Sequence, residues 1–164
     1  MLLKKIWLIL GAALFLALPA TAKAEEVTVY AEYALIDGGM ALEETDSIWN
    51  IGGWTSGYEA IFFVDYVEEG YYDIILDYAK QDDSGPVDMA MRIESDGYDE
   101  ETIEFSLAPT GSDWSVYEYE SVGSAFFPEG GATLTFGAAD PLGDEYLCNL
   151  RSVTLSPVID DLAG

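Results

Sequence analysis

The sequence contains no histidine and a single cysteine, Cys148. Without histidine, the chain lacks the commonest general base, the usual partner of catalytic serine and cysteine, and the usual transition-metal ligand. One cysteine cannot form an internal disulfide, and its apolar surroundings in the sequence are typical of a small buried side chain. These absences argue against hydrolases that depend on histidine and against an imidazole-ligated metal.

Basic residues are also scarce, with six lysines and arginines against 31 aspartates and glutamates and a formal net charge of −25. Such a chain repels phosphate backbones and anionic membrane faces, so nucleic acid and lipid headgroups are poor partners. We interpret the acidity as a source of solubility, or as an adaptation to salty water, rather than as the mark of a specific cationic ligand. Disorder is a poor interpretation because half of the residues are apolar.

The start of the chain has the pattern of a secretory signal peptide. Two lysines precede an apolar run over 6–18, and an A-x-A cleavage motif follows at 22–24. The run is shorter than the roughly 20 residues of a membrane-spanning helix, which favours export over a retained anchor. We predict a signal peptide over 1–24, with cleavage after residue 22 as the alternative, and one domain over 25–164. The mature protein is expected to be extracellular or periplasmic, with no membrane insertion.

The rest of the chain has the pattern of short β-strands separated by turns. Segments rich in β-branched and aromatic residues alternate with clusters of Gly, Pro and Asp, and no segment keeps a helical period. The predicted strands are 26–33, 59–67, 71–79, 87–95, 102–107, 114–122, 132–138 and 147–155. Their number and near-regular spacing predict an all-β fold, an antiparallel β-sandwich of jelly-roll type.

Adjacent carboxylates, such as Glu68-Glu69 and Asp82-Asp83, occur throughout the sequence. In a chain with so many acidic residues, solvated turns explain these pairs better than the acid and base of a glycosidase do. The sequence also has no glycine-rich phosphate loop and no zinc or EF-hand spacing. We therefore expect a protein that is not an enzyme, with a hydrolase that uses acidic residues alone as a third class.

Two tryptophans lie beside glycines, where a core tryptophan is unusual. Trp54 follows two glycines, and Trp114 follows Gly-Ser-Asp. An aromatic ring exposed at a loop tip can stack on the apolar face of a pyranose while nearby amides bond its hydroxyls. Taken alone, the two tryptophans leave two interpretations open, which are sugar binding and packing at the rim of the core.

Four segments carry motifs in an order and spacing that one family shares. Segment 30–44 has an Ala-Glu pair, a Gly-Gly pair and an acid eleven residues after the first. Segment 50–79 contains Asn-x-Gly and Gly-x-Tyr, 110–117 has Thr-Gly-x-Trp with one extra residue, and 148–155 matches a closing strand. Over Val29 to Leu155 the chain thus resembles family 6 carbohydrate-binding modules, of the galactose-binding-like group. The resemblance implies a calcium-containing β-sandwich with a sugar cleft between loops at one end.

The resemblance also implies which residues hold the sugar, between two aromatic rings and beside an asparagine. The second aromatic position is Gly53 in this chain, so Trp54 is the candidate replacement from a shifted loop. A displacement of one residue reverses side-chain direction in an extended segment, so Trp54 could equally point elsewhere. The expected carbohydrate-binding residues are Trp114, Asn149, Trp54, Tyr117 and Tyr58.

The acidic positions of the family imply a structural calcium ion. Glu32 and Glu43 match two of its ligands, and two carboxylates with backbone carbonyls suit a hard cation. The chain departs from the family at Tyr30, where a polar ligand is usual, and it has no obvious late acid near Ser156.

We therefore predict a secreted, non-catalytic module that binds a polysaccharide or oligosaccharide, with a secreted enzyme or a cell-surface protein as a further partner. The alternative is a structural or adhesive cell-surface β-sandwich that self-assembles or docks a protein partner. The missing second aromatic and the acidity favour that alternative.

Overall fold

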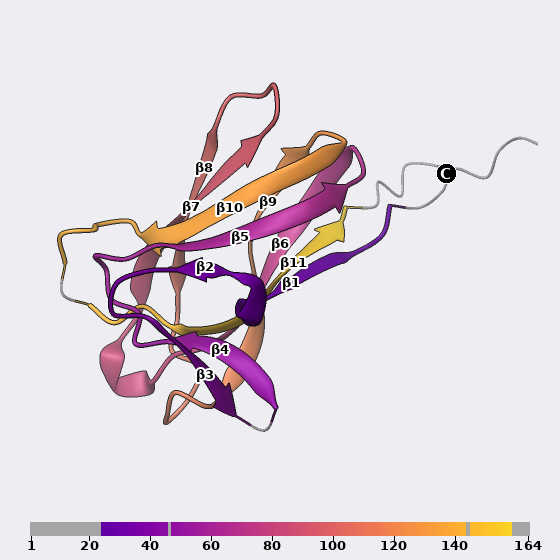
Figure 1. Ribbon diagram of the computed structural model, residues 1–164. Helices are drawn as coiled ribbons and strands as arrows, with labels where there is room; N and C mark the ends of the chain where they lie inside the picture. Colours follow the sequence, from indigo (N-terminus) through magenta and orange to yellow (C-terminus); the bar gives the residue numbers. More distant parts are fainter. Residues whose placement is uncertain (1–23, 46, 144, 159–164) are drawn as a thin grey trace, which may run out of the picture.

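The computed structural model describes residues 24–45, 47–143 and 145–158, which form two antiparallel β-sheets packed face to face (Figure 1). Sheet A has the order β3 (Ala41–Thr45), β4 (Ile48–Gly52), β11 (Asn149–Pro157), β6 (Gly70–Ala79) and β9 (Tyr117–Phe127), with β1 (Val27–Tyr30) also paired to β11. Sheet B has the order β2 (Leu35–Ile36), β5 (Ala60–Val67), β10 (Gly130–Ala138), β7 (Val87–Ser95) and β8 (Glu101–Leu107). Two 3-10 turns, η1 (Ala31–Tyr33) and η2 (Asp82–Ser84), complete the described elements. The predicted antiparallel β-sandwich is confirmed.

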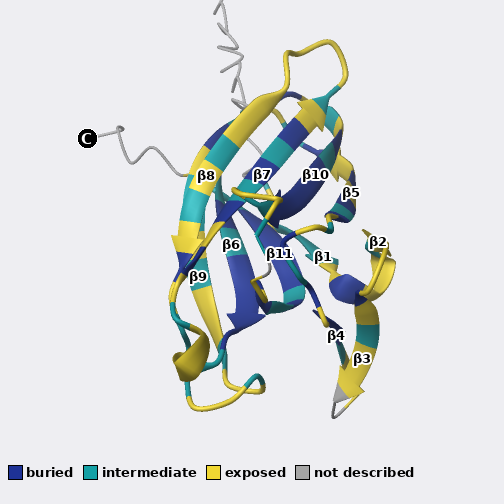
Figure 2. Cartoon of the chain, turned by 90° about the vertical axis from the view of Figure 1, so that its left-hand side faces the viewer, coloured by how far each residue is buried: buried dark blue, intermediate teal, exposed yellow. Residues whose placement is uncertain are grey.

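The core lies between the sheets and follows from the two-residue period of the strands. In β7, Val87, Met89 and Met91 are buried, while Asp88 is exposed. β6 and β10 show the same alternation in their first halves and then four consecutive buried residues each, and Figure 2 shows long buried segments in both strands. Each large apolar side chain buried in this way contributes about 1.5–3 kcal/mol to folding.

The predicted strands correspond to elements of the structure, with three differences. The strand predicted over 26–33 ends at Tyr30, because residues 31–33 form the 3-10 turn η1. Segment 35–52 forms the short strands β2, β3 and β4, which the sequence did not reveal because they are brief and carry acidic residues such as Glu43 and Glu44. The strand predicted to begin at Trp114 begins instead at Tyr117. Trp114 consequently lies in the loop before β9.

The start of β1 and the end of β11 lie at one end of sheet A, and the loops around Asn149 lie at the start of β11. Val27 pairs with Leu155, near the end of β11, whereas Asn149 lies at the start of that strand. Beside Asn149, backbone hydrogen bonds join the loop after β4 to the loop before β11 (Figure 1). The described residues contain no helix that is long and apolar enough to cross a membrane. The predicted signal peptide falls on residues outside the described part, except for Ala24, and stays a prediction.

Candidate functional site

A cleft of about 270 Å³ opens where these loops meet, and we call it the loop-end cleft. Its lining residues are Glu43, Gly53, Trp54, Trp114, Tyr146, Cys148 and Asn149. They come from β3, from the loops after β4 and before β9, from the segment that leads into β11 and from the first residue of β11. The cleft thus brings together three of the five residues predicted to bind carbohydrate.

Trp114 is half-buried in a loop that is held by its own polar groups. The Ser115 hydroxyl and the Ser115 backbone N–H both donate to Asp113 Oδ1, the N–H at 2.7 Å. These bonds, first that of the hydroxyl, lower the pKa of the Asp113 carboxyl. The Thr110 hydroxyl donates to the Val116 carbonyl at 2.6 Å, which closes the loop around the tryptophan. The local turn chemistry therefore keeps Trp114 at the border of the cleft rather than in the core.

Lys80 lies under this part of the cleft with only 1% of its surface exposed. Its Nζ atom is 5.6 Å from the centre of the Trp114 ring and donates to the carbonyls of Tyr146 and Leu147, both at 3.1 Å. Burial is the main cause that lowers the pKa of the Lys80 ammonium. One buried cation thus joins the Trp114 ring to the backbone on the other side of the cleft.

Tyr146 is the site residue that the sequence reasoning missed. It is 58% exposed, and its ring meets the Trp114 ring nearly edge-on, with centroids 6.4 Å apart. A β-bridge to Thr55 fixes its backbone. The available signal was an aromatic residue three positions before Asn149, the expected asparagine of the closing strand.

Gly53 explains why the aromatic ring comes from a different segment. Its φ of 63° lies in the left-handed region, and a Cβ there would be 3.1 Å from the Gly39 carbonyl oxygen. A tyrosine at this position, as the family resemblance implies, would be strained in this backbone. Tyr146 borders the same cleft from the opposite loop.

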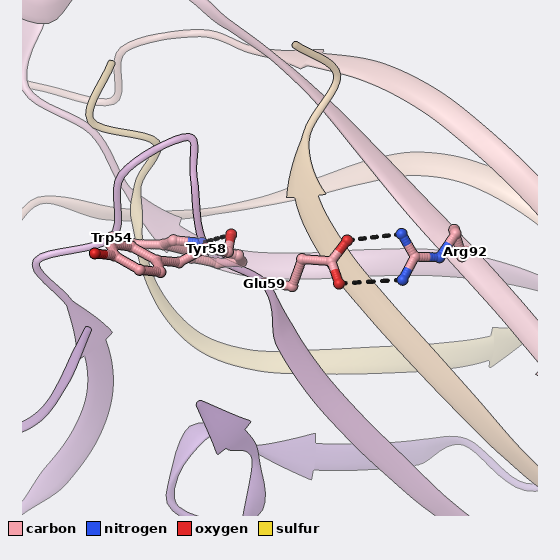
Figure 3. Close-up of polar contacts among 4 residues, drawn as sticks. All are labelled: Trp54, Tyr58, Glu59 and Arg92. Atoms are coloured by element: carbon pink, nitrogen blue, oxygen red, sulfur yellow. Dashed lines mark hydrogen bonds and ion pairs between the residues drawn. The ribbon is translucent and has the colours of Figure 1, made fainter. Parts of the chain in front are cut away.

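Trp54 is not an exposed ring, so its burial favours the interpretation of core packing over that of an open stacking platform. Only 1% of its surface is accessible, and its Nε1–H donates to the Tyr58 carbonyl at 2.8 Å (Figure 3). Its own carbonyl accepts the N–H of Leu147 at 2.9 Å. Trp54 therefore forms a buried wall of the cleft and ties down the segment that carries Tyr146.

Tyr58 and Tyr117 do not line the cleft. The half-buried Tyr58 ring packs on Gly38 and Gly39, where a Cβ at Gly38 would overlap it. Tyr117 is half-buried at the start of β9, with the Arg151 guanidinium 3.4 Å from its ring centre. Burial raises the pKa of Tyr117, against the opposing effects of Arg151 and a hydrogen bond with Asn149.

Asn149 lies at the cleft and is partly engaged by backbone. Its Nδ2 donates to the Trp114 carbonyl at 3.0 Å. This bond holds the Trp114 loop against β11 and uses one of the two N–H groups of the amide. At the floor of the cleft, burial raises the pKa of the Cys148 thiol to about 12, as expected for a buried, unreactive cysteine.

The two predicted calcium ligands border different cavities. Glu32 lines one with Tyr30 and Trp49, whereas Glu43 lines the loop-end cleft and its Oε2 accepts from Asn50 Nδ2 at 3.4 Å. The described part of the chain contains no group of three or more acidic, histidine or cysteine side chains placed to hold a metal. These residues fit a shared calcium ion poorly, and calcium binding stays a prediction.

Comparisons with known proteins agree on the fold. No family model matches the sequence, and no curated protein matches it. A family 35 carbohydrate-binding module from Clostridium thermocellum is 16% identical with a TM-score of 0.66, over 82% of this chain and 100% of that one. A Podospora anserina GH26-CBM35 β-(1,4)-mannanase is 17% identical with a TM-score of 0.62, over 84% of this chain but 29% of the enzyme.

An Arthrobacter globiformis isomalto-dextranase is similar over 23% of its length, at 20% identity and a TM-score of 0.63. The chain therefore has the β-sandwich fold found in carbohydrate-binding modules, both alone and as part of larger enzymes. The similar structures include modules of family 35, and membership of family 6 is not confirmed.

Proposed function

We propose that the protein is an exported, non-catalytic module that binds a polysaccharide or oligosaccharide in the loop-end cleft. The observation that carries this proposal is the meeting of Trp114, Tyr146 and Asn149 at one cleft of about 270 Å³. Aromatic faces and an amide are the groups that a sugar ring needs for stacking and for hydrogen bonding. A secreted enzyme or a cell-surface protein would supply any catalysis.

The charges of the cleft support a binding role rather than catalysis. Glu43 is the one acidic residue that lines it within the described chain. Glycoside hydrolysis by the common mechanisms needs two carboxyl groups about 5–9.5 Å apart across the scissile bond. A single carboxylate can hold a sugar hydroxyl or amine, but it cannot supply both of the carboxyl groups that these mechanisms require.

The rigidity of the cleft supports a modest but specific affinity. Lys80, Trp54 and Asn149 fix its aromatic segments before any ligand arrives. Each aromatic contact is worth about 1 kcal/mol beyond area burial, so the loss of one contact should weaken binding at least several-fold.

Affinity electrophoresis in gels that contain β-mannan, β-1,3-galactan, dextran or chitosan tests the proposal. We expect retardation by at least one polysaccharide, and a loss of about tenfold or more in affinity for Trp114→Ala. Tyr119→Ala is the matched control, because Tyr119 is 74% exposed on β9 and lies outside the cleft. Equal retardation of both variants would remove Trp114 from the binding site.

A second candidate function, self-assembly on a cell surface, has its own supporting observation. A groove beside β1 and β5 is lined by four exposed aromatic side chains, namely Tyr30, Tyr33, Phe63 and Tyr66. Within the described residues, β5 is paired on its β2 side only at Ala60 and Ile61, which leaves the rest of that edge without a described strand partner. Light scattering over a concentration series would show dimers or polymers if a second copy covers this groove, and a monomer at every concentration would exclude this function.

A further inference from the structure

None of the three basic residues of the described chain has a side chain that lines the loop-end cleft, although Lys80 is buried beneath Trp114. Lys80 is buried and donates to two backbone carbonyls. Arg92, on β7 of sheet B, pairs with Glu59 through two hydrogen bonds of 2.6 and 3.1 Å (Figure 3). Arg151 stacks on Tyr117 and lies outside the cleft lining. The cleft therefore offers no cationic side chain to a uronate or a sulfated sugar.

A carboxylate, in contrast, is built into the cleft. Glu43 is exposed on β3, and its Oε2 accepts from Asn50 Nδ2 at 3.4 Å. Gly52 lies next to this carboxylate, and a Cβ at Gly52 would collide with it. The absence of a side chain at Gly52 thus leaves the space that the Glu43 carboxylate occupies.

Glu43 shares the cleft with the two aromatic side chains, so a ligand stacked on them comes near its charge. Aromatic faces beside a carboxylate suit a ligand that is both a flat-faced ring and a cation.

Resting on the proposed function, we infer that the loop-end cleft prefers a sugar with a free amine, such as glucosamine, over neutral sugars and over uronates. The ammonium pairs with the Glu43 carboxylate while the ring lies against Trp114 and Tyr146. The acidic surface of the whole chain adds long-range attraction, but it does not distinguish one position on the protein from another.

Calorimetric titration with three short ligands tests this inference. The probes are the β-1,4-linked trisaccharides of glucosamine, of N-acetylglucosamine and of glucose, in about 150 mM salt so that charges beyond roughly 8 Å are screened. We expect the free-amine trisaccharide to bind about threefold to tenfold more tightly than the other two.

Variants at Glu43 separate the local carboxylate from the general acidity. Glu43→Gln should remove the preference for the amine, and Glu43→Asp should retain part of it. Glu104→Gln is the matched control, because Glu104 is exposed on β8 in sheet B and also removes one charge. Thermal melts of each variant confirm that the fold is intact.

The outcomes distinguish the two proposals. If the neutral and amine trisaccharides bind equally in a Trp114-dependent manner, or if Glu43→Gln weakens all of them equally, the amine preference is wrong and the sugar-binding function stands. If Glu43→Gln and Glu104→Gln both keep the preference for the free-amine trisaccharide, the general acidity of the protein causes that preference. The inference about Glu43 then fails. If no trisaccharide or polysaccharide binds, both proposals fail together.

Discussion

The segments around the two loop tryptophans, 53–58 and 110–117, have similar compositions but opposite environments. Each joins one tryptophan to glycine, serine and other turn residues. Trp54 is 1% exposed, whereas Trp114 is half-buried at the border of the loop-end cleft. The local sequence therefore predicts that both tryptophans lie in loops, but it does not determine which of them is exposed to solvent.

Tertiary partners account for the difference. Trp54 follows the buried end of β4, and its indole N–H is satisfied by the Tyr58 carbonyl within the same loop, so the ring enters the core at little polar cost. Under Trp114 lies the ammonium of Lys80, and Asp113 caps the turn from the solvent side. The buried Lys80 ammonium lies under Trp114, which borders the cleft. Trp54 has its indole N–H bonded within its own loop and is a structural residue of the core.

The largest expected effect is on stability at Trp54. Trp54→Ala should lower the free energy of unfolding by about 3–5 kcal/mol, because it empties a large buried volume. Urea denaturation followed by circular dichroism measures this loss. Trp114→Ala is the natural comparison and should cost less than about 1.5 kcal/mol, since its ring is only half-buried. Similar losses at the two positions would contradict the division between them.

Substitution of Lys80 should have a smaller effect on stability, and it should also weaken the anchoring of Trp114. Lys80→Met leaves two backbone carbonyls without their donor but also removes the cost of burying an ammonium. The expected net loss is about 1 kcal/mol at neutral pH, with weaker sugar binding because Trp114 and Tyr146 lose their common anchor. Urea denaturation and the polysaccharide gels measure the two effects, and unchanged values in both would show that Lys80 anchors neither segment.

The same variant has a pH dependence with a defined sign. Burial holds the pKa of folded Lys80 below the ordinary lysine value of 10.5, so between these two values the unfolded chain binds more protons than the folded chain. The contribution of Lys80 to stability therefore rises with pH in this window. The deficit of Lys80→Met relative to the parent protein should grow as the pH approaches 10.5. A deficit that shrinks over this range would contradict the buried-ammonium assignment.

The fold was predictable because the long strands follow an alternating pattern. Met89 and Met91 on β7, and Ile74 and Leu76 on β6, show in the sequence the same faces that the structure buries. The short strands β2 to β4 gave no such signal, since two to five residues are too few to establish a period. Their pairing is set by tertiary contacts that the local sequence does not contain.

The site was predictable only in part. The motif pattern identified Trp114 and Asn149, which do meet at the cleft through a hydrogen bond. Tyr146 was missed because it lies beyond any family motif, and its position depends on hydrogen bonds between two loops about 90 residues apart. The burial of Trp54 depends on the same loop pairing. Contacts of such long range have no counterpart in sequence spacing.

Calcium should have the smallest effect on stability, and it should act on the segment of the chain that precedes Trp54. Glu32 and Glu43 lie on η1 and β3, the elements that lead into β4 and Trp54, but they border different cavities. An ion held by one of them at a time would bind weakly and raise the melting temperature by only about 1–3 °C.

Calorimetric melts with millimolar calcium, with magnesium and with a chelator measure this effect, and Glu32→Gln is compared with Glu104→Gln as a control for charge. A small, calcium-specific rise that Glu32→Gln alone removes would assign the ion to η1. A rise of about 10 °C that either Glu32→Gln or Glu43→Gln abolishes would instead require both carboxylates on one ion. The segment before Trp54 would then have to be rearranged around it, and Glu43 would no longer be free to face a sugar.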